Sequence, residues 1–74
     1  MKIQEKLGLV IRQLRIERGL SQERFALDAD IDRTYISDIE KGGRNVSIEM
    51  IERLANIFQM SISELLKKAE EYGK

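Results

Sequence analysis

The segment LSQERFALDADIDRTYISDIEKGGR, residues 20–44, decides the fold that we expect for this chain. It predicts two short helices joined by a turn of about three residues. Ser21 and Asp32 are suited to cap these helices, because their side-chain oxygens can accept a backbone N–H of the first turn. Asp30 can adopt the left-handed conformation of a turn. The glycines at positions 42 and 43 are the expected end of the second helix.

Apolar residues on both sides of this segment predict three more helices. In the N-terminal stretch they recur at spacings of three and four up to about Arg18, which indicates one amphipathic helix. Ser47 is the expected cap of a fourth helix, and Ser61 with Glu64 forms the capping-box pattern of a fifth. The sequence shows no strand pattern, repeat or linker. We therefore expect one compact all-α domain of five helices over residues 1–74.

The composition argues against several classes of function. The chain has 74 residues, 42% hydrophobic and 35% charged, which suits one small folded domain. It contains no Cys and no His, so we expect no disulfide, no metal, no cofactor and no enzyme activity. Catalysis would have to rest on a carboxylate pair such as Glu49 and Glu52. At one-turn spacing on an exposed helix, such a pair is ordinary surface charge.

The distribution of charge and hydropathy indicates the compartment and the class of partner. No apolar run approaches the roughly 20 residues of a membrane span, and the N-terminus is too charged for a signal peptide, so we expect a cytoplasmic protein without membrane contact. The 13 basic and 13 acidic residues balance, which argues against indiscriminate coating of nucleic acid. Residues 28–40 hold one Arg against five acids. Asp28, Asp30 and Asp32 lie near the turn and the cap, where they can satisfy backbone N–H groups.

The second helix of the segment separates an apolar face from a polar one. Two short helices that cross closely need small and apolar side chains between them; the candidates are Phe25, Ala26, Ala29, Ile31, Ile36 and Ile39. The helical period then turns a donor-rich set outward; its members are Arg33, Thr34, Ser37 and Lys41, flanked by Tyr35 and Asp38. Arg can donate two hydrogen bonds to guanine, and Thr can contact a base. Spacing and face together predict a helix-turn-helix over about residues 21–41 that binds double-stranded DNA.

Three stretches, RIERGLSQERFA, DRTYISDIEKGGRN and IERLANIF, resemble the Cro and phage-repressor type of helix-turn-helix DNA-binding protein over roughly residues 7–66. The run RTYIS-x-IE followed by RN is most similar to the controller proteins of bacterial restriction-modification systems, which are free-standing dimers. The resemblance implies a lambda-repressor-like fold. It also implies a sequence-specific transcription regulator that acts as a homodimer on a pseudo-palindromic operator.

The resemblance further implies roles for individual residues. It places Arg33, Thr34 and Ser37 in the major groove. The contacts to phosphate or to neighbouring base edges would come from a second set: Gln22, Tyr35, Arg44, Asn45 and Ser47. Arg15 and Glu40 fall where members of the family join the first helix to the end of the recognition helix. We therefore expect a structural ion pair between them.

Several of these residues have plainer interpretations. Arg33 could be a solvated side chain paired with Asp30 or Asp32, Tyr35 a surface-packed ring, and Arg44 and Asn45 ordinary loop residues. Two positions also depart from the family pattern. Asp30 stands in the turn where many members have Gly. Asp38 could accept from a cytosine amino group or repel phosphate, which leaves the base preference open.

The C-terminal helices, over about residues 47–70, carry more apolar residues than one narrow stripe needs. All of them could belong to the core. A lone domain of this size is only marginally stable, however, and a single half-site binds weakly, so we expect a symmetric homodimer. The interface candidates are Phe58, Met60, Ile62 and Leu66.

The sequence leaves the regulatory details open. It does not give the operator, the sign of regulation or a small-molecule effector. Activation would need a surface for RNA polymerase, and no residue pattern singles one out. The alternative function is an antitoxin or adaptor that uses the same fold on a protein partner, which a stable one-to-one complex with another protein would favour.

Overall fold

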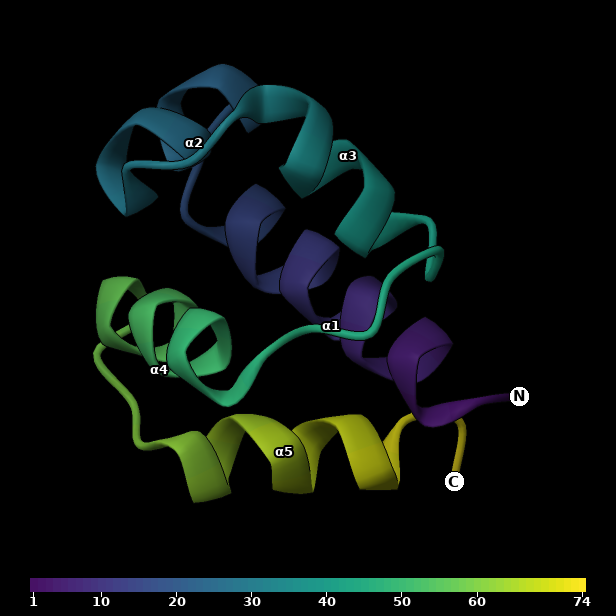
Figure 1. Ribbon diagram of the computed structural model, residues 1–74. Helices are drawn as coiled ribbons and strands as arrows, with labels where there is room; N and C mark the ends of the chain where they lie inside the picture. Colours follow the sequence, from purple (N-terminus) through teal and green to yellow (C-terminus); the bar gives the residue numbers. More distant parts are fainter.

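The computed structural model describes residues 1–74 and contains five helices and no strand. In chain order the helices are α1 (Ile3–Glu17), α2 (Gln22–Ala29), α3 (Arg33–Glu40), α4 (Ile48–Ile57) and α5 (Ile62–Glu71). Figure 1 shows α1 running through the middle, with α2 and α3 on one side of it and α4 and α5 on the other. The predicted all-α fold of five helices is confirmed. None of the helices combines the length and apolar character that crossing a membrane requires.

Side-chain caps fix where four of the helices begin. Each cap accepts a backbone N–H of the first turn at 2.8–3.1 Å; the four are Ser21, Asp32, Ser47 and Ser61. At α5 the carboxylate of Glu64 also accepts the backbone N–H of Ser61 at 3.0 Å, which completes the predicted capping box. Because caps depend only on neighbouring residues, the sequence predicts them correctly.

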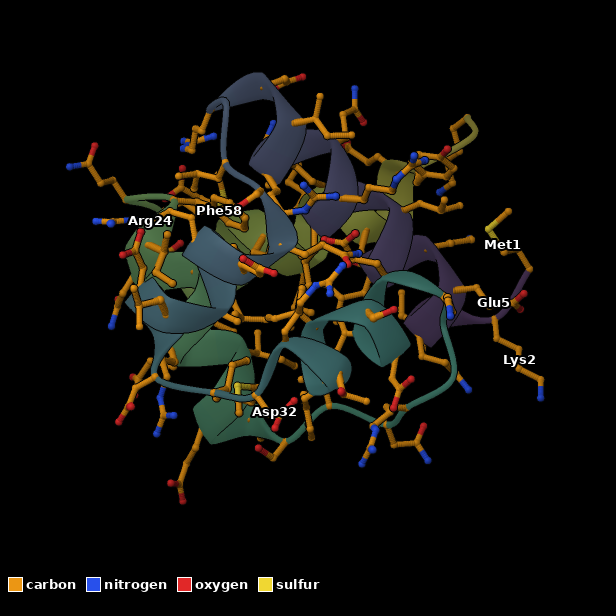
Figure 2. The ribbon with its side chains drawn as sticks, turned by 90° about the horizontal axis from the view of Figure 1, so that it is seen from above. Met1, Lys2, Glu5, Arg24, Asp32 and Phe58 are labelled. Atoms are coloured by element: carbon orange, nitrogen blue, oxygen red, sulfur yellow. The ribbon has the colours of Figure 1, made fainter.

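The core consists of fifteen buried apolar side chains drawn from all five helices or their ends. Phe25 of α2 and Phe58 at the end of α4 stack at its centre, with ring centroids 5.2 Å apart. Phe58 is 1% exposed, whereas Met1 and Lys2 lie at the edge of the molecule, as Figure 2 shows. Ile36 and Ile39 turn the inner face of α3 into this core, as predicted.

Phe58 corrects one prediction about the dimer interface. Its side chain is 1% exposed within a single chain, and it stacks on Phe25 rather than facing outward. The other three interface candidates, Met60, Ile62 and Leu66, are only partly buried against the core. Phe58 is therefore a core residue, and the apolar excess of α4 and α5 is divided between the interior and the surface.

The end of α3 lies unusually close to α1. A Cβ atom at Gly8 would collide with the backbone carbonyl oxygen of Ile39 and would lie 3.0 Å from that of Glu40. The following turn is equally tight, because Gly42 has a φ of +76° and a Cβ there would lie 2.9 Å from the Cα of Glu5. These two glycines let the last turn of α3 rest directly on the first half of α1.

Candidate nucleic-acid interface

The orientation of α3 depends on a buried ion pair between Arg15 and Glu40. Arg15 donates from Nε to Glu40 Oε2 at 2.7 Å and from Nη2 to Oε1 at 3.1 Å. The two residues are only 9% and 7% exposed. Arg15 also donates from Nη1 to the carbonyl oxygen of Leu20 at 2.8 Å. The guanidinium thus ties the last turn of α3 to α1, with a planar, two-pronged geometry, and also binds the turn that precedes α2.

Gln22 takes part in the same network. Its Nε2 donates to Glu40 Oε1 at 3.1 Å, so the carboxylate at the end of α3 also binds the first residue of α2. One amide hydrogen and the carbonyl oxygen of Gln22 remain available for another partner. The structure therefore gives Gln22 a positioning contact in addition to the phosphate contact expected of it.

The outward face of α3 gathers the residues predicted to read DNA. A shallow depression at the crossing of α2 and α3 is lined by six polar side chains; they are Gln22, Arg33, Thr34, Ser37, Asp38 and Lys41. Arg33 has one ion pair, to Glu23 at 4.0 Å, and both side chains are well exposed. That partner differs from Asp30 and Asp32, which the sequence suggests. An exposed pair at this separation holds Arg33 weakly and leaves it able to reach a ligand.

A second depression adjoins the first at the end of α3. It is lined by Tyr35, Asp38, Lys41, Gly43, Arg44 and Asn45. Arg44 donates to a single oxygen of Asp38, Oδ2, from Nε at 3.2 Å and from Nη2 at 3.0 Å. The same guanidinium carbon lies 4.7 Å from the centre of the Tyr35 ring, a cation–π contact. Spacing along the sequence predicts neither contact, because Asp38 and Arg44 lie on opposite sides of the glycine turn that follows α3.

Ser47, also expected at this interface, caps α4. Its hydroxyl oxygen accepts the backbone N–H of Met50 at 3.1 Å, and the residue is exposed. The hydroxyl hydrogen remains free to donate, so a cap and a phosphate contact are compatible at this position.

Two arginines outside the interface have structural roles that sequence reasoning missed. Arg18 donates from Nη2 to the carbonyl oxygen of Phe58 at 2.9 Å and lies 5.0 Å from the centre of its ring. Arg53 donates from Nη1 to the carbonyl oxygen of Ala29 at 3.3 Å. Both cations satisfy carbonyl groups at the C-terminal end of another helix, where the helix dipole favours positive charge. Their partners are 24 and 40 residues away, so local spacing carries no signal for them.

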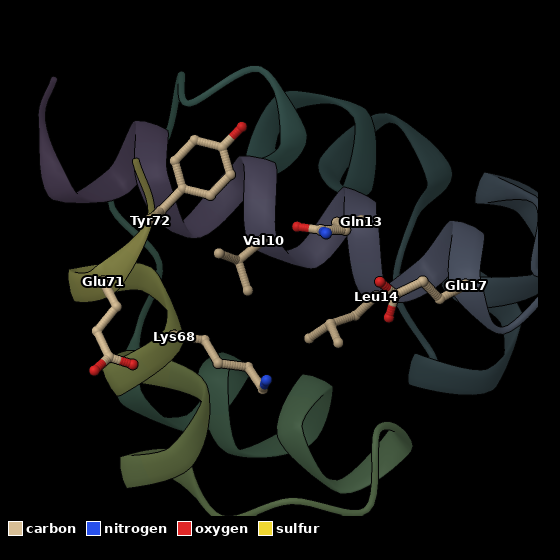
Figure 3. Close-up of a pocket in the computed structure, with 7 residues that line it drawn as sticks. All are labelled: Val10, Gln13, Leu14, Glu17, Lys68, Glu71 and Tyr72. Atoms are coloured by element: carbon tan, nitrogen blue, oxygen red, sulfur yellow. The ribbon is translucent and has the colours of Figure 1, made fainter. Parts of the chain in front are cut away.

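Other surface depressions lie away from the interface. One is lined by Met60, Ile62 and Leu66 with four polar residues from α4 and from the start of α5, so the three remaining dimer candidates lie together. Figure 3 shows another, between α1 and the last turn of α5, where Tyr72, Lys68 and Glu17 surround Val10 and Leu14. The structure assembles no group of three potential metal ligands.

Comparison with known proteins identifies the family. Residues 11–65 match the sequence model of the family described as Helix-turn-helix. The chain belongs to this helix-turn-helix family. The family is one of transcription regulators. The predicted resemblance to repressor-type helix-turn-helix proteins, and to controller proteins among them, is confirmed.

Two relatives and one solved structure illustrate the similarity. The chain is 43% identical over 60 residues to the control protein C.BamHI of Bacillus amyloliquefaciens, covering 80% of this chain and 74% of that protein. It is 41% identical over 70 residues to the control protein C.MunI of a Mycoplasma species, covering 93% and 95%. The restriction-modification controller protein C.Esp1396I, solved as a tetramer with its natural 35-base-pair operator, superposes with a TM-score of 0.79. It is 32% identical, with coverage of 96% of this chain and 99% of that one.

Proposed function

We propose that this chain is a cytoplasmic, sequence-specific transcription regulator that binds a pseudo-palindromic operator as a homodimer. The observation that carries the proposal is the polar depression where α2 and α3 cross, which is lined by Gln22, Arg33, Thr34, Ser37, Asp38 and Lys41. Polar and cationic side chains of this kind match the donor and acceptor pattern of the major groove. The operator-bound structure of C.Esp1396I, a relative along nearly the whole chain, supports the same function.

In this proposal the residues that read bases differ from those that fix the position on the duplex. Arg33, Thr34 and Ser37 enter the major groove from the outward face of α3 and contact base edges. Contacts to phosphates come from residues around them: Gln22, Tyr35, Lys41, Arg44, Asn45 and Ser47. The buried Arg15–Glu40 pair keeps α3 at a fixed angle to α1 and α2, so the reading side chains move together as one rigid unit.

The dimer supplies affinity and symmetry. Met60, Ile62 and Leu66 form a partly exposed apolar group at one depression, which suits a self-complementary contact between two copies. A two-fold axis at this surface would present two α3 helices to successive major grooves, with centres about 34 to 36 Å apart. In this proposal the operator lies upstream of the chain's own gene, and a restriction endonuclease gene lies beside it. The similarity to restriction-modification controller proteins supports this expectation.

The test is a binding measurement on two DNA fragments. The native chain is titrated against the region upstream of its own gene and against a duplex of the same length and composition with scrambled order. We expect footprinting to reveal a protected inverted repeat and the upstream fragment to bind at least about a thousandfold more tightly. Equal affinity for both fragments would reject the proposal. A stable one-to-one complex with another protein would then favour an adaptor.

A further inference from the structure

Asp38 is the one acidic residue that lines the two depressions of the proposed interface. It is also shared by both, together with Lys41, so it lies where the α3 face meets the following loop. An unpaired carboxylate at this place would repel DNA phosphates. The structure shows instead that Asp38 is engaged by Arg44 through two hydrogen bonds to one oxygen.

The geometry of the pair leaves part of Arg44 free. Asp38 Oδ2 accepts from Nε and Nη2, which lie along one edge of the guanidinium plane, so the Nη1 amine remains unbonded. The Tyr35 ring supports one face of the same group at 4.7 Å. Arg44 thus has contacts on one edge and on one face of its guanidinium, its side chain is 46% exposed, and its Nη1 group has no partner within the chain.

The geometry points to Asp38 as a specificity-determining residue that acts through Arg44, an inference that rests on the proposed function. A mobile, unpaired arginine is attracted to any phosphate, because this attraction is independent of sequence. An arginine that is paired with Asp38 and packed on Tyr35 attracts the phosphates of an arbitrary DNA sequence less strongly than an unpaired arginine does. Its free donor contacts DNA well only when α3 is fully seated and a phosphate lies at the correct place. Asp38 therefore lowers non-specific binding while preserving the contact that the operator receives.

The test uses Asp38→Asn, Arg44→Gln and the double variant in the full chain. Binding to the scrambled duplex is measured at several salt concentrations. Asp38→Asn should bind this duplex about threefold or more tightly at low salt, with a salt slope steeper by about 0.9, the value of one added phosphate contact. The operator fragment should gain less, so the ratio of operator to scrambled affinity should fall. In the Arg44→Gln background the effect of Asp38→Asn should disappear.

Two results would overturn the inference. One is an unchanged scrambled affinity and slope in Asp38→Asn. The other is a gain that persists in the Arg44→Gln background, which would mean that the carboxylate repels phosphate directly. Glu70→Gln, an exposed substitution on α5 with the same change in net charge, controls for a general charge effect and should leave scrambled binding unchanged. Failure of the native chain to distinguish the two DNA fragments would reject the proposed function, whereas the scrambled-duplex measurements decide the role of Asp38 separately.

Discussion

Glu40 accepts two hydrogen bonds from Arg15, at 2.7 and 3.1 Å, and a third from Gln22 at 3.1 Å. One buried carboxylate therefore joins the end of α3 to α1 and to the first residue of α2. Removal of Glu40 would leave the positive charge of Arg15 in a site where it is only 9% exposed.

We expect Glu40→Ala to lower the free energy of unfolding by about 3 to 5 kcal/mol, the usual cost of leaving one buried charge without its partner. This is a large fraction of the total stability of a small domain. Urea denaturation followed by circular dichroism measures it. Glu70→Ala, at an exposed position, is the matched control, and an equally small effect of both substitutions would contradict a structural role for the pair.

Gly8 should not tolerate a side chain. In Gly8→Ala the new methyl group would collide with the carbonyl oxygen of Ile39, so α1 and α3 must separate. We expect a net loss of about 1 to 3 kcal/mol, even though alanine favours helices. Gly43→Ala provides the comparison, since a Cβ there meets its nearest neighbour at an ordinary 3.6 Å. Thermal melts of both variants would refute this account if Gly43→Ala were the more destabilising.

Leu66 and Phe58 should respond differently to substitution. Leu66→Asp is expected to convert the proposed dimer to a folded monomer, because it places a charge at the partly exposed apolar group. Sedimentation equilibrium measures the oligomeric state, and circular dichroism checks the fold. Phe58→Ala is expected instead to destabilise each chain by about 3 to 5 kcal/mol, since it empties the centre of the core. A folded dimer of Leu66→Asp would mean that the interface lies elsewhere.

Substitutions of Arg33 and Lys41 should distinguish a contact to a base from a contact to a phosphate. Arg33→Ala should weaken operator binding by about 1 to 3 kcal/mol and relax preference at one base pair, with little effect on scrambled DNA. Lys41→Ala should weaken binding to every sequence and lower the salt slope by about 1, as expected for a phosphate contact. Competition assays with single-base operator variants measure the first effect, and salt titrations the second. If both variants changed base preference and salt slope in the same way, the assignment of Arg33 to a base and Lys41 to a phosphate would be wrong.

Glu64 should make the stability of α5 depend on pH. The pKa of Glu64 lies below its ordinary value, chiefly because the carboxylate accepts the backbone N–H of Ser61. A lowered pKa in the folded state means that the contribution is present above the unfolded-state pKa and is lost as the pH falls through the folded-state pKa. Glu64→Gln should therefore be less stable than the native chain at neutral pH, and the difference should vanish in acid. Denaturation curves across this range would disprove the linkage if the difference stayed constant.

The parts of the fold that sequence could predict are those that depend on nearby residues. Ser21, Asp32, Ser47 and Ser61 cap their helices through N–H groups two or three residues away. Asp30 adopts the expected left-handed conformation with a φ of 56°. The outward position of Arg33, Thr34 and Ser37 follows from the helical period once Ile36 and Ile39 are buried, and the depression at α3 contains all three.

The parts that sequence could not predict depend on which distant residue completes a contact. Phe58 lies on a helix with apolar residues on more than one side, and only its stacking on Phe25 shows that it faces inward. Periodicity cannot choose between two apolar faces. Asp38 has the same ambiguity, because whether a carboxylate opposes DNA or restrains Arg44 depends on the path of the loop after Gly43.

The contacts that orient α3 come from its inner face and from Glu40 in its last turn, whereas Arg33 and Thr34 project from its first turn into solvent. Different residues of the same eight-residue helix therefore stabilise the fold and contact DNA. A library that randomises positions 33, 34 and 37 while retaining Gly8, Arg15 and Glu40 would sample new operator preferences on an unchanged framework. The DNA sequence that the chain prefers could therefore change without any change in the residues that hold α3 in place.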